Sequence, residues 1–166
     1  MTSSTSRILV GVVLIVAPLL AVVLKSFSFG WMIVFLLFGP IFLLIAGYAL
    51  QIVIAIHSFM SKKHLHGTHL RRASIAAWVT SVGIVVLGIF MPDGGDMYWG
   101  STFQAWLGAY GPNADAVHAA TDGWSDWVAV VAVAVWLVGY VWLLVEWVVA
   151  LVQRSRAKRA GGVLPA

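Results

Sequence analysis

The 166-residue sequence contains no cysteine, which removes several classes of protein at once. Without thiols the chain cannot be a disulfide-bonded scaffold, a thiolate metal protein or a membrane redox enzyme built on a Cys-x-x-Cys pair. Charge is almost as scarce, because Asp, Glu, Lys and Arg together make up 10% of the residues. An average soluble domain carries about 25%. This scarcity excludes a soluble globular domain, a disordered protein and a nucleic-acid-binding arm.

Catalytic signatures and cofactor motifs are also missing from the sequence, so we expect no bound cofactor. Apolar residues take their place: 61% of the chain is hydrophobic and its mean hydropathy is +0.97. A transmembrane helix takes about 20 apolar residues, and four segments are long enough. In hydrocarbon the backbone must satisfy its own hydrogen bonds, so each segment is expected to be helical. The segments are Ile8–Leu24, Trp31–Ile56, Ala73–Phe90 and Trp127–Val152.

These segments predict an all-α integral membrane protein, a four-transmembrane-helix bundle that forms a single membrane domain over residues 1–166. The distribution of Lys and Arg predicts its orientation, because positive residues accumulate in cytoplasmic segments. Nine of the ten basic residues fall on one side, and Lys25 alone falls on the other. We therefore expect both termini in the cytoplasm. No organelle-targeting signal is visible, so the plasma (inner) membrane of a bacterium is the expected location.

The basic residues of the cytoplasmic side suit contact with anionic lipid headgroups of the inner leaflet. They lie in the loop between the second and third segments and in the tail, residues 153–166. The loop also carries His64, His66 and His69, which could bind a metal, but it offers no carboxylate to orient them. We expect no nucleic-acid partner. The predicted headgroup residues are Lys62, Lys63, Arg71, Arg72, Arg154, Arg156, Lys158 and Arg159.

The outer loop, residues 91–126, separates the third and fourth segments. It opens with a turn rich in Pro, Gly and Asp, and bulky apolar residues then recur at helical spacing. This pattern predicts a short amphipathic helix in the outer membrane interface. Its aromatic stripe either anchors in lipid or docks a partner protein. The stripe consists of Trp99, Phe103, Trp106, Leu107 and Tyr110.

A second polar stretch follows in the same loop. Asp115, His118 and Asp122 share one face if this stretch is helical, and they are weak candidates for a divalent metal site. The alternative is a solvated polar face that leads into the N-terminal cap of the fourth segment. We expect no metal here, because Gly123 is expected to interrupt the helix.

Glu146 is an acid inside a predicted span, where acids are rare and often functional. It lies about 9 Å from the inner end of its helix, at 1.5 Å per residue. Gln51 is expected at a similar depth and Tyr48 near the same level, so the sequence predicts a polar layer in the inner third of the membrane. The carboxyl group is expected to be protonated, hydrogen-bonded to Gln51 or directed toward Arg154.

Two functions are consistent with these features. The first is a non-catalytic accessory or assembly subunit that binds another membrane protein or a second copy of the chain. The small size, the aromatic outer loop and the Trp-rich fourth segment favour it. The second is a small transporter or channel-like protein that uses Glu146 and Gln51 as an intramembrane polar site. A lipid or quinone enzyme has less support, because the outer His and Asp residues are its sole candidate set.

Overall fold

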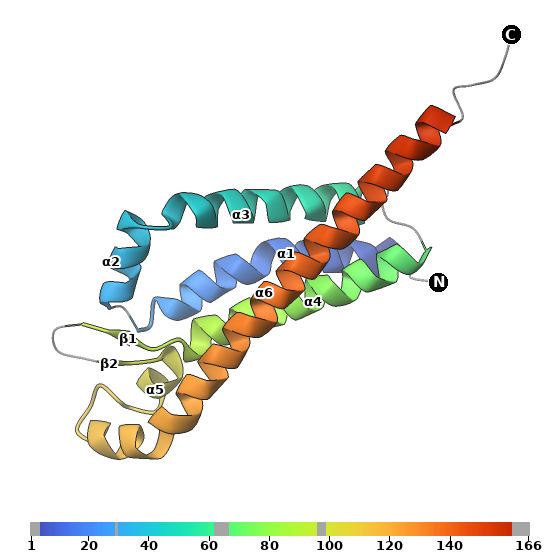
Figure 1. The fold of residues 1–166 in the computed structure, drawn as a ribbon. Helices are drawn as coiled ribbons and strands as arrows, with labels where there is room; N and C mark the ends of the chain where they lie inside the picture. Colours follow the sequence, from blue (N-terminus) through green and yellow to red (C-terminus); the bar gives the residue numbers. More distant parts are fainter. Residues whose placement is uncertain (1–3, 29, 62–66, 96–98, 161–166) are drawn as a thin grey trace, which may run out of the picture.

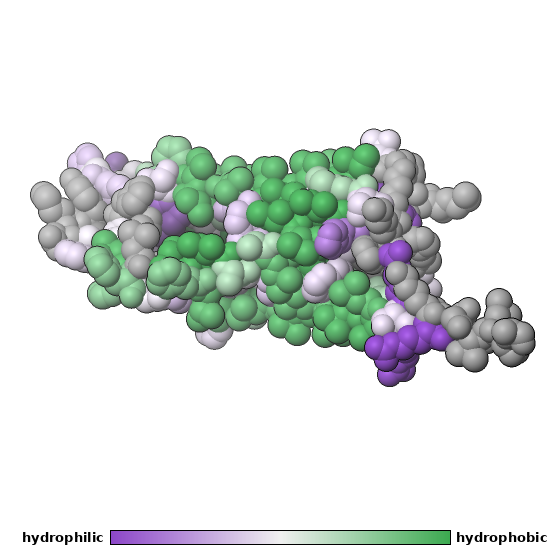
Figure 2. All heavy atoms as spheres, turned by 90° about the horizontal axis from the view of Figure 1, so that it is seen from above, coloured by the Kyte–Doolittle hydropathy of each residue, from purple (hydrophilic) through white to green (hydrophobic). Residues whose placement is uncertain are grey.

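The computed structural model describes residues 4–28, 30–61, 67–95 and 99–160, and this part of the chain is mostly helical (Figure 1). Figure 2 shows a broad apolar band between two more polar ends. The predicted helical class is confirmed, and the candidate spans support a multi-pass membrane protein. Within the described residues, four helices are long and apolar enough to cross a membrane: Thr5–Lys25, Ile41–Met60, Thr68–Phe90 and Ala114–Arg156.

The described helices and strands follow one another as α1 (Ser4–Lys25), α2 (Trp31–Phe38), α3 (Ile41–Ile54), η1 (Ala55–Met60), α4 (Gly67–Phe90), β1 (Asp93–Gly94), β2 (Trp99–Gly100), α5 (Thr102–Trp106) and α6 (Ala114–Ala160). Helix α4 packs along both α6 and α1, and η1 packs against α1. The first turns of α1 and α4 and the last turns of α6 lie at one end of the molecule, called the inner end below (Figure 1). The two strands and α5 lie at the opposite, outer end.

Glycines bring α4 close to its two neighbours. A Cβ on Gly83 would lie 2.7 Å from the backbone nitrogen of Trp136 in α6. A Cβ on Gly88 would lie 2.7 Å from the carbonyl oxygen of Ala21 in α1. Small residues at such crossings permit the close backbone packing by which helices associate in lipid.

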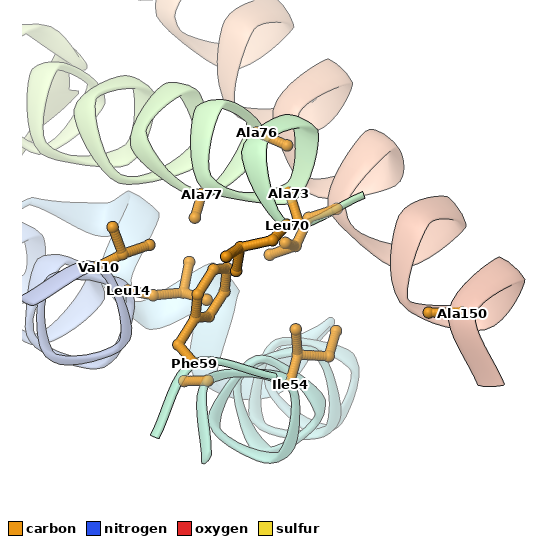
Figure 3. Packing of buried hydrophobic residues seen from close by; sticks show 11 residues of the cluster. Val10, Leu14, Ile54, Phe59, Leu70, Ala73, Ala76, Ala77 and Ala150 are labelled. Atoms are coloured by element: carbon orange, nitrogen blue, oxygen red, sulfur yellow. The ribbon is translucent and has the colours of Figure 1, made fainter. Parts of the chain in front are cut away.

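The buried apolar core lies toward the inner end (Figure 3). It takes side chains from α1, α3, η1, α4 and α6. Figure 3 shows Phe59 of η1 next to Leu14 of α1 and Leu70 of α4, and all three side chains are buried. This packing places η1 firmly against α1, and the end of α3 contributes Ile54 to the same core.

The second predicted segment is not one continuous helix. The chain breaks at Gly39 and Pro40, between α2 and α3, and the last turns form the π-helix η1. Proline has no backbone N–H and disfavours helical geometry in the residue before it, so Gly-Pro ends α2. The sequence predicted one span over Trp31–Ile56, and the structure interrupts it at this dipeptide.

The outer loop also differs from the prediction. Trp99 lies in β2, whose Gly100 pairs antiparallel with Asp93. Helix α5 begins only after Ser101, which forms a capping box with Gln104. The predicted single helix with a stripe from position 99 to position 110 is therefore wrong, because a strand, a capped short helix and a turn divide it. Helix α6 starts at Ala114 and runs through position 123, so the predicted interruption there is also wrong.

Candidate functional site

A buried carboxylate joins α6 to α4 near the inner end. The side chain of Glu146 is 9% exposed, and its Oε2 lies 2.7 Å from Nδ1 of His69, which is 32% exposed. The indole N–H of Trp142 donates to Oε1 over 3.4 Å. The guanidinium group of Arg72 lies 4.0 Å from the same oxygen. Glu146 therefore has one neutral donor, one titratable partner and one permanent cation around it.

Helical spacing explains why these groups meet. His69 and Arg72 are three residues apart on α4, and Trp142 and Glu146 are four apart on α6, so each pair shares one helix face. Gly139 brings the two faces together, because a Cβ there would lie 2.8 Å from the backbone nitrogen of Thr80. When the carboxylate is ionised, His69 donates its Nδ1–H to it. The arrangement can therefore lock two helices together.

Gln51 belongs to a different contact. Its Nε2 donates to the carbonyl oxygen of Leu14 over 2.6 Å. The hydroxyl of Tyr48 donates to the carbonyl oxygen of Ile15 over 2.9 Å. Pro18 lies four residues after Leu14 and has no N–H to give to that carbonyl. Polar side chains of neighbouring helices commonly satisfy carbonyls freed in this way.

The predicted polar layer is thus two separate contacts. Gln51 is buried against α1, whereas Glu146 is buried against α4. The predicted hydrogen bond between Gln51 and Glu146 is not formed, because the amide and the carboxylate point to different helices. The predicted alternative, a carboxylate directed toward Arg154, is replaced by the contacts to His69 and Arg72.

The five residues of the predicted outer stripe have four different environments. Phe103 stacks on Phe90 of α4 at 5.0 Å between ring centroids, which ties α5 to the helices. Trp106 and Leu107 are exposed, and they remain candidates for an interfacial anchor or docking surface. Tyr110 is half-buried; burial and then the negative charge of Asp93 raise its pKa above 10.0.

Trp99 packs against His118, one of the three weak candidates for a metal site. Its ring lies 5.4 Å from that of His118. The imidazole Nδ1 lies 2.9 Å from Oδ1 of Asp122, and this oxygen also accepts a hydrogen bond from Nε2 of Gln104 over 2.8 Å. Asp115 is exposed at the start of α6. The described residues contain no group of three metal-binding side chains, and His118 and Asp122 are tied to each other and to Gln104.

The predicted headgroup residues lie at the inner end where the structure describes them. Arg71 and Arg72 are exposed on α4, and the last turns of α6 expose three further arginines. Lys62, Lys63 and the side chain of Lys158 lie outside the described residues. The three arginines are Arg154, Arg156 and Arg159.

Sequence reasoning missed the role of His69. The predicted third span began at Ala73, which left His69 in a loop, whereas α4 begins at Gly67 and carries it inside the helix. The three-residue spacing between His69 and Arg72 could have indicated that both lie on one face of a helix. The chain matches no protein-family model, no curated protein and no solved structure. The functional argument therefore depends on the geometry described above.

Proposed function

We propose that the chain is a small non-catalytic membrane protein that serves as an accessory or stabilising subunit of a larger membrane complex. The observation that carries this proposal is the exposure of the first turns of α3. All five residues from position 42 to position 46 are exposed, including Phe42 at 81% and Leu43 at 76%. Successive helical residues are about 100° apart, so these five surround the whole helix. Every side of this part of α3 therefore carries an exposed residue.

The exposed surface continues across the break into α2. Phe38 is 88% exposed, and Phe35 lies one turn before it on the same side. Phe42 lies on the other side of Gly39 and Pro40, where the backbone is exposed, and the three exposed rings are called the aromatic ridge below. Large rings next to small residues provide the shape that a neighbouring transmembrane helix can pack against. A partner membrane protein, or a second copy of the chain, would cover this ridge.

The orientation is part of the same proposal. The inner end carries the first turn of α1 with Arg7, the first turns of α4 and the last turns of α6. The basic residues of these three segments support a cytoplasmic inner end by the positive-inside rule. We place the protein in the plasma membrane with both termini in the cytoplasm, as a four-helix bundle in which α1, the α2–α3 segment, α4 and α6 each cross once.

Site-specific photo-cross-linking tests the accessory function. A photoreactive side chain at Phe42 is expected to capture one membrane protein, or a second copy, in stoichiometric amounts. The matched control is Val138 in α6, which is also exposed and apolar. Capture of lipid alone at both positions would overturn the proposal, because it would mean that the bilayer itself covers the ridge.

A second function has one specific observation in its favour. Glu146 is an intramembrane acid whose histidine partner is partly exposed, which suits a small proton or cation transporter. Gln51 would have no direct part in such a site, since its amide is bonded to Leu14. Flux measured in liposomes decides between the two functions. A transporter is expected to lose flux in Glu146→Gln, whereas an accessory subunit has no flux to lose.

A further inference from the structure

A groove of about 350 Å³ lies between α1 and α4. This volume falls within the range of small-molecule pockets in proteins, about 300–1,000 Å³. Its lining is almost entirely apolar, and many of the lining side chains are partly exposed, so the groove is open to the surroundings. The α1 wall includes Val12, Val16 and Leu20, and the α4 wall includes Trp78, Val82 and Val85.

Both walls lie within candidate membrane spans, so the groove opens to hydrocarbon. Along α1 it extends from Val12 to Leu20, about 12 Å at 1.5 Å per residue. A slot of this length and composition accommodates part of a lipid acyl chain. Apolar contact alone would not select one lipid over another, because the surrounding bilayer offers the same chemistry.

Arg71 provides the selectivity that the groove lacks. It lies seven residues before Trp78 on α4, which is about two turns, so both residues are on the same stripe of the helix. Arg71 therefore lies about 10 Å closer to the inner end than Trp78. Its side chain extends further that way, because long helical side chains lean toward the helix N-terminus, which is the inner end here. Arg71 is exposed and has no ion-pair partner among the described residues, whereas Arg72 lies 4.0 Å from Glu146.

We propose that the groove and Arg71 together bind one anionic phospholipid of the inner leaflet. The phosphate group contacts the Arg71 guanidinium, and one acyl chain lies between α1 and α4. Along α4, Arg71 lies nearer the inner end than the groove does. The headgroup of an inner-leaflet lipid lies in the same way nearer the cytoplasm than its acyl chains. This site goes beyond the accessory function proposed above and requires no partner protein.

Native mass spectrometry of the full-length protein tests the site. The protein is released from nanodiscs that contain phosphatidylglycerol or phosphatidylcholine, and the retained lipid is counted. Arg71→Gln removes the phosphate contact and Val16→Trp fills the groove. The matched controls are Arg156→Gln, an exposed arginine on α6, and Val22→Trp, an exposed valine on α1 outside the groove.

We expect the wild-type protein to retain one phosphatidylglycerol in preference to phosphatidylcholine. Arg71→Gln is expected to weaken this preference about fivefold, which corresponds to about 1 kcal/mol per basic residue near an anionic headgroup. Val16→Trp is expected to reduce retention of both lipids, and the two controls are expected to behave like the wild type. Circular dichroism verifies the fold of each variant, and Val82→Trp replaces Val16→Trp if the latter fails to fold.

Three outcomes would overturn the site. Equal losses in Arg71→Gln and Arg156→Gln would mean that the inner end attracts lipid through its overall charge. Unchanged retention in both groove-filling variants would mean that the groove is not occupied. Competition by inorganic phosphate would assign Arg71 to a free anion. The cross-linking at Phe42 is independent of these results, so the two proposals can fail separately.

Discussion

The two ends of the molecule hold their buried charges in different ways, and the outer end encloses its charges more completely. There, the ammonium group of Lys25 donates to the hydroxyl of Ser28 over 3.0 Å and to the carbonyl of Met91 over 2.8 Å. It lies 3.7 Å from the carboxylate of Asp93, whose side chain is 1% exposed. That carboxylate also accepts the backbone N–H of Gly30 over 3.1 Å. The ends of α1 and α4, the start of α2 and β1 all meet at this ion pair.

At the inner end, Glu146 connects α4 to α6 alone, and both of its charged or titratable partners reach the surface. Such partners are accessible from the surroundings, whereas a charge enclosed by backbone groups from several segments chiefly stabilises the fold. The difference shows that the burial of a charged group does not identify a functional site by itself. The exposure of its partners is what separates the inner carboxylate from the outer one.

The largest expected effect tests the enclosed ion pair. Asp93→Asn leaves the ammonium group of Lys25 buried without a counter-charge, and we expect the free energy of unfolding to fall by about 3 kcal/mol. Asp115→Asn is the matched control, because Asp115 is exposed, and a change within about 0.5 kcal/mol is expected there. Reversible unfolding in mixed micelles measures both. Similar values for the two variants would contradict a structural role for the outer pair.

The inner carboxylate is expected to contribute less stability. Glu146→Gln keeps the size of the side chain and one acceptor oxygen but loses the charge-assisted bond to His69. We expect a loss of about 1–2 kcal/mol in the same assay. His69→Ala in the Glu146→Gln background should add little, because the interaction is already weakened. A loss as large as that of Asp93→Asn would remove the distinction between the two ends.

A third test concerns Gln51, which the sequence analysis placed beside Glu146. Gln51→Leu removes the donor to Leu14, and we expect a loss of about 1 kcal/mol, typical of side-chain hydrogen bonds in membranes. Pro18→Ala restores the backbone donor that Leu14 lacks. In the double variant the cost of Gln51→Leu should therefore largely disappear. Additive effects in this double-mutant cycle would mean that Gln51 does not replace the missing proline N–H.

The helical class of the chain follows directly from its apolar runs, since four stretches of suitable length leave few other structures in lipid. The details that failed all depend on backbone chemistry at single residues. Pro40 interrupts the predicted second span, and Ser101 starts a new helix inside a predicted one. Propensity and periodicity average over a window, so neither resolves such a local event.

The candidate site was predictable only in part. Glu146 stands out because an acid within an apolar run is rare. Its partner was missed, because the predicted third span began at Ala73 and left His69 in a loop, whereas depth alone placed Gln51 beside Glu146. The choice between them depends on which helices touch, and the glycine contacts of α4 with α6 decide that. Pro18 was a usable signal for Gln51, since its missing N–H calls for a donor from another helix.

The smallest expected effect concerns the pKa of Tyr110 at the outer end. Burial and then the charge of Asp93 raise the pKa of Tyr110 above 10.0, so the folded state keeps the phenol proton at a pH where the unfolded chain has released it. Stability from this group is therefore present below about pH 10 and is lost as the pH rises through the folded-state pKa. Unfolding measured between pH 8 and about pH 11 should show a shallower alkaline decline in Tyr110→Phe than in the wild type. Parallel curves would mean that neither burial nor the charge of Asp93 raises the pKa of Tyr110 in the folded state.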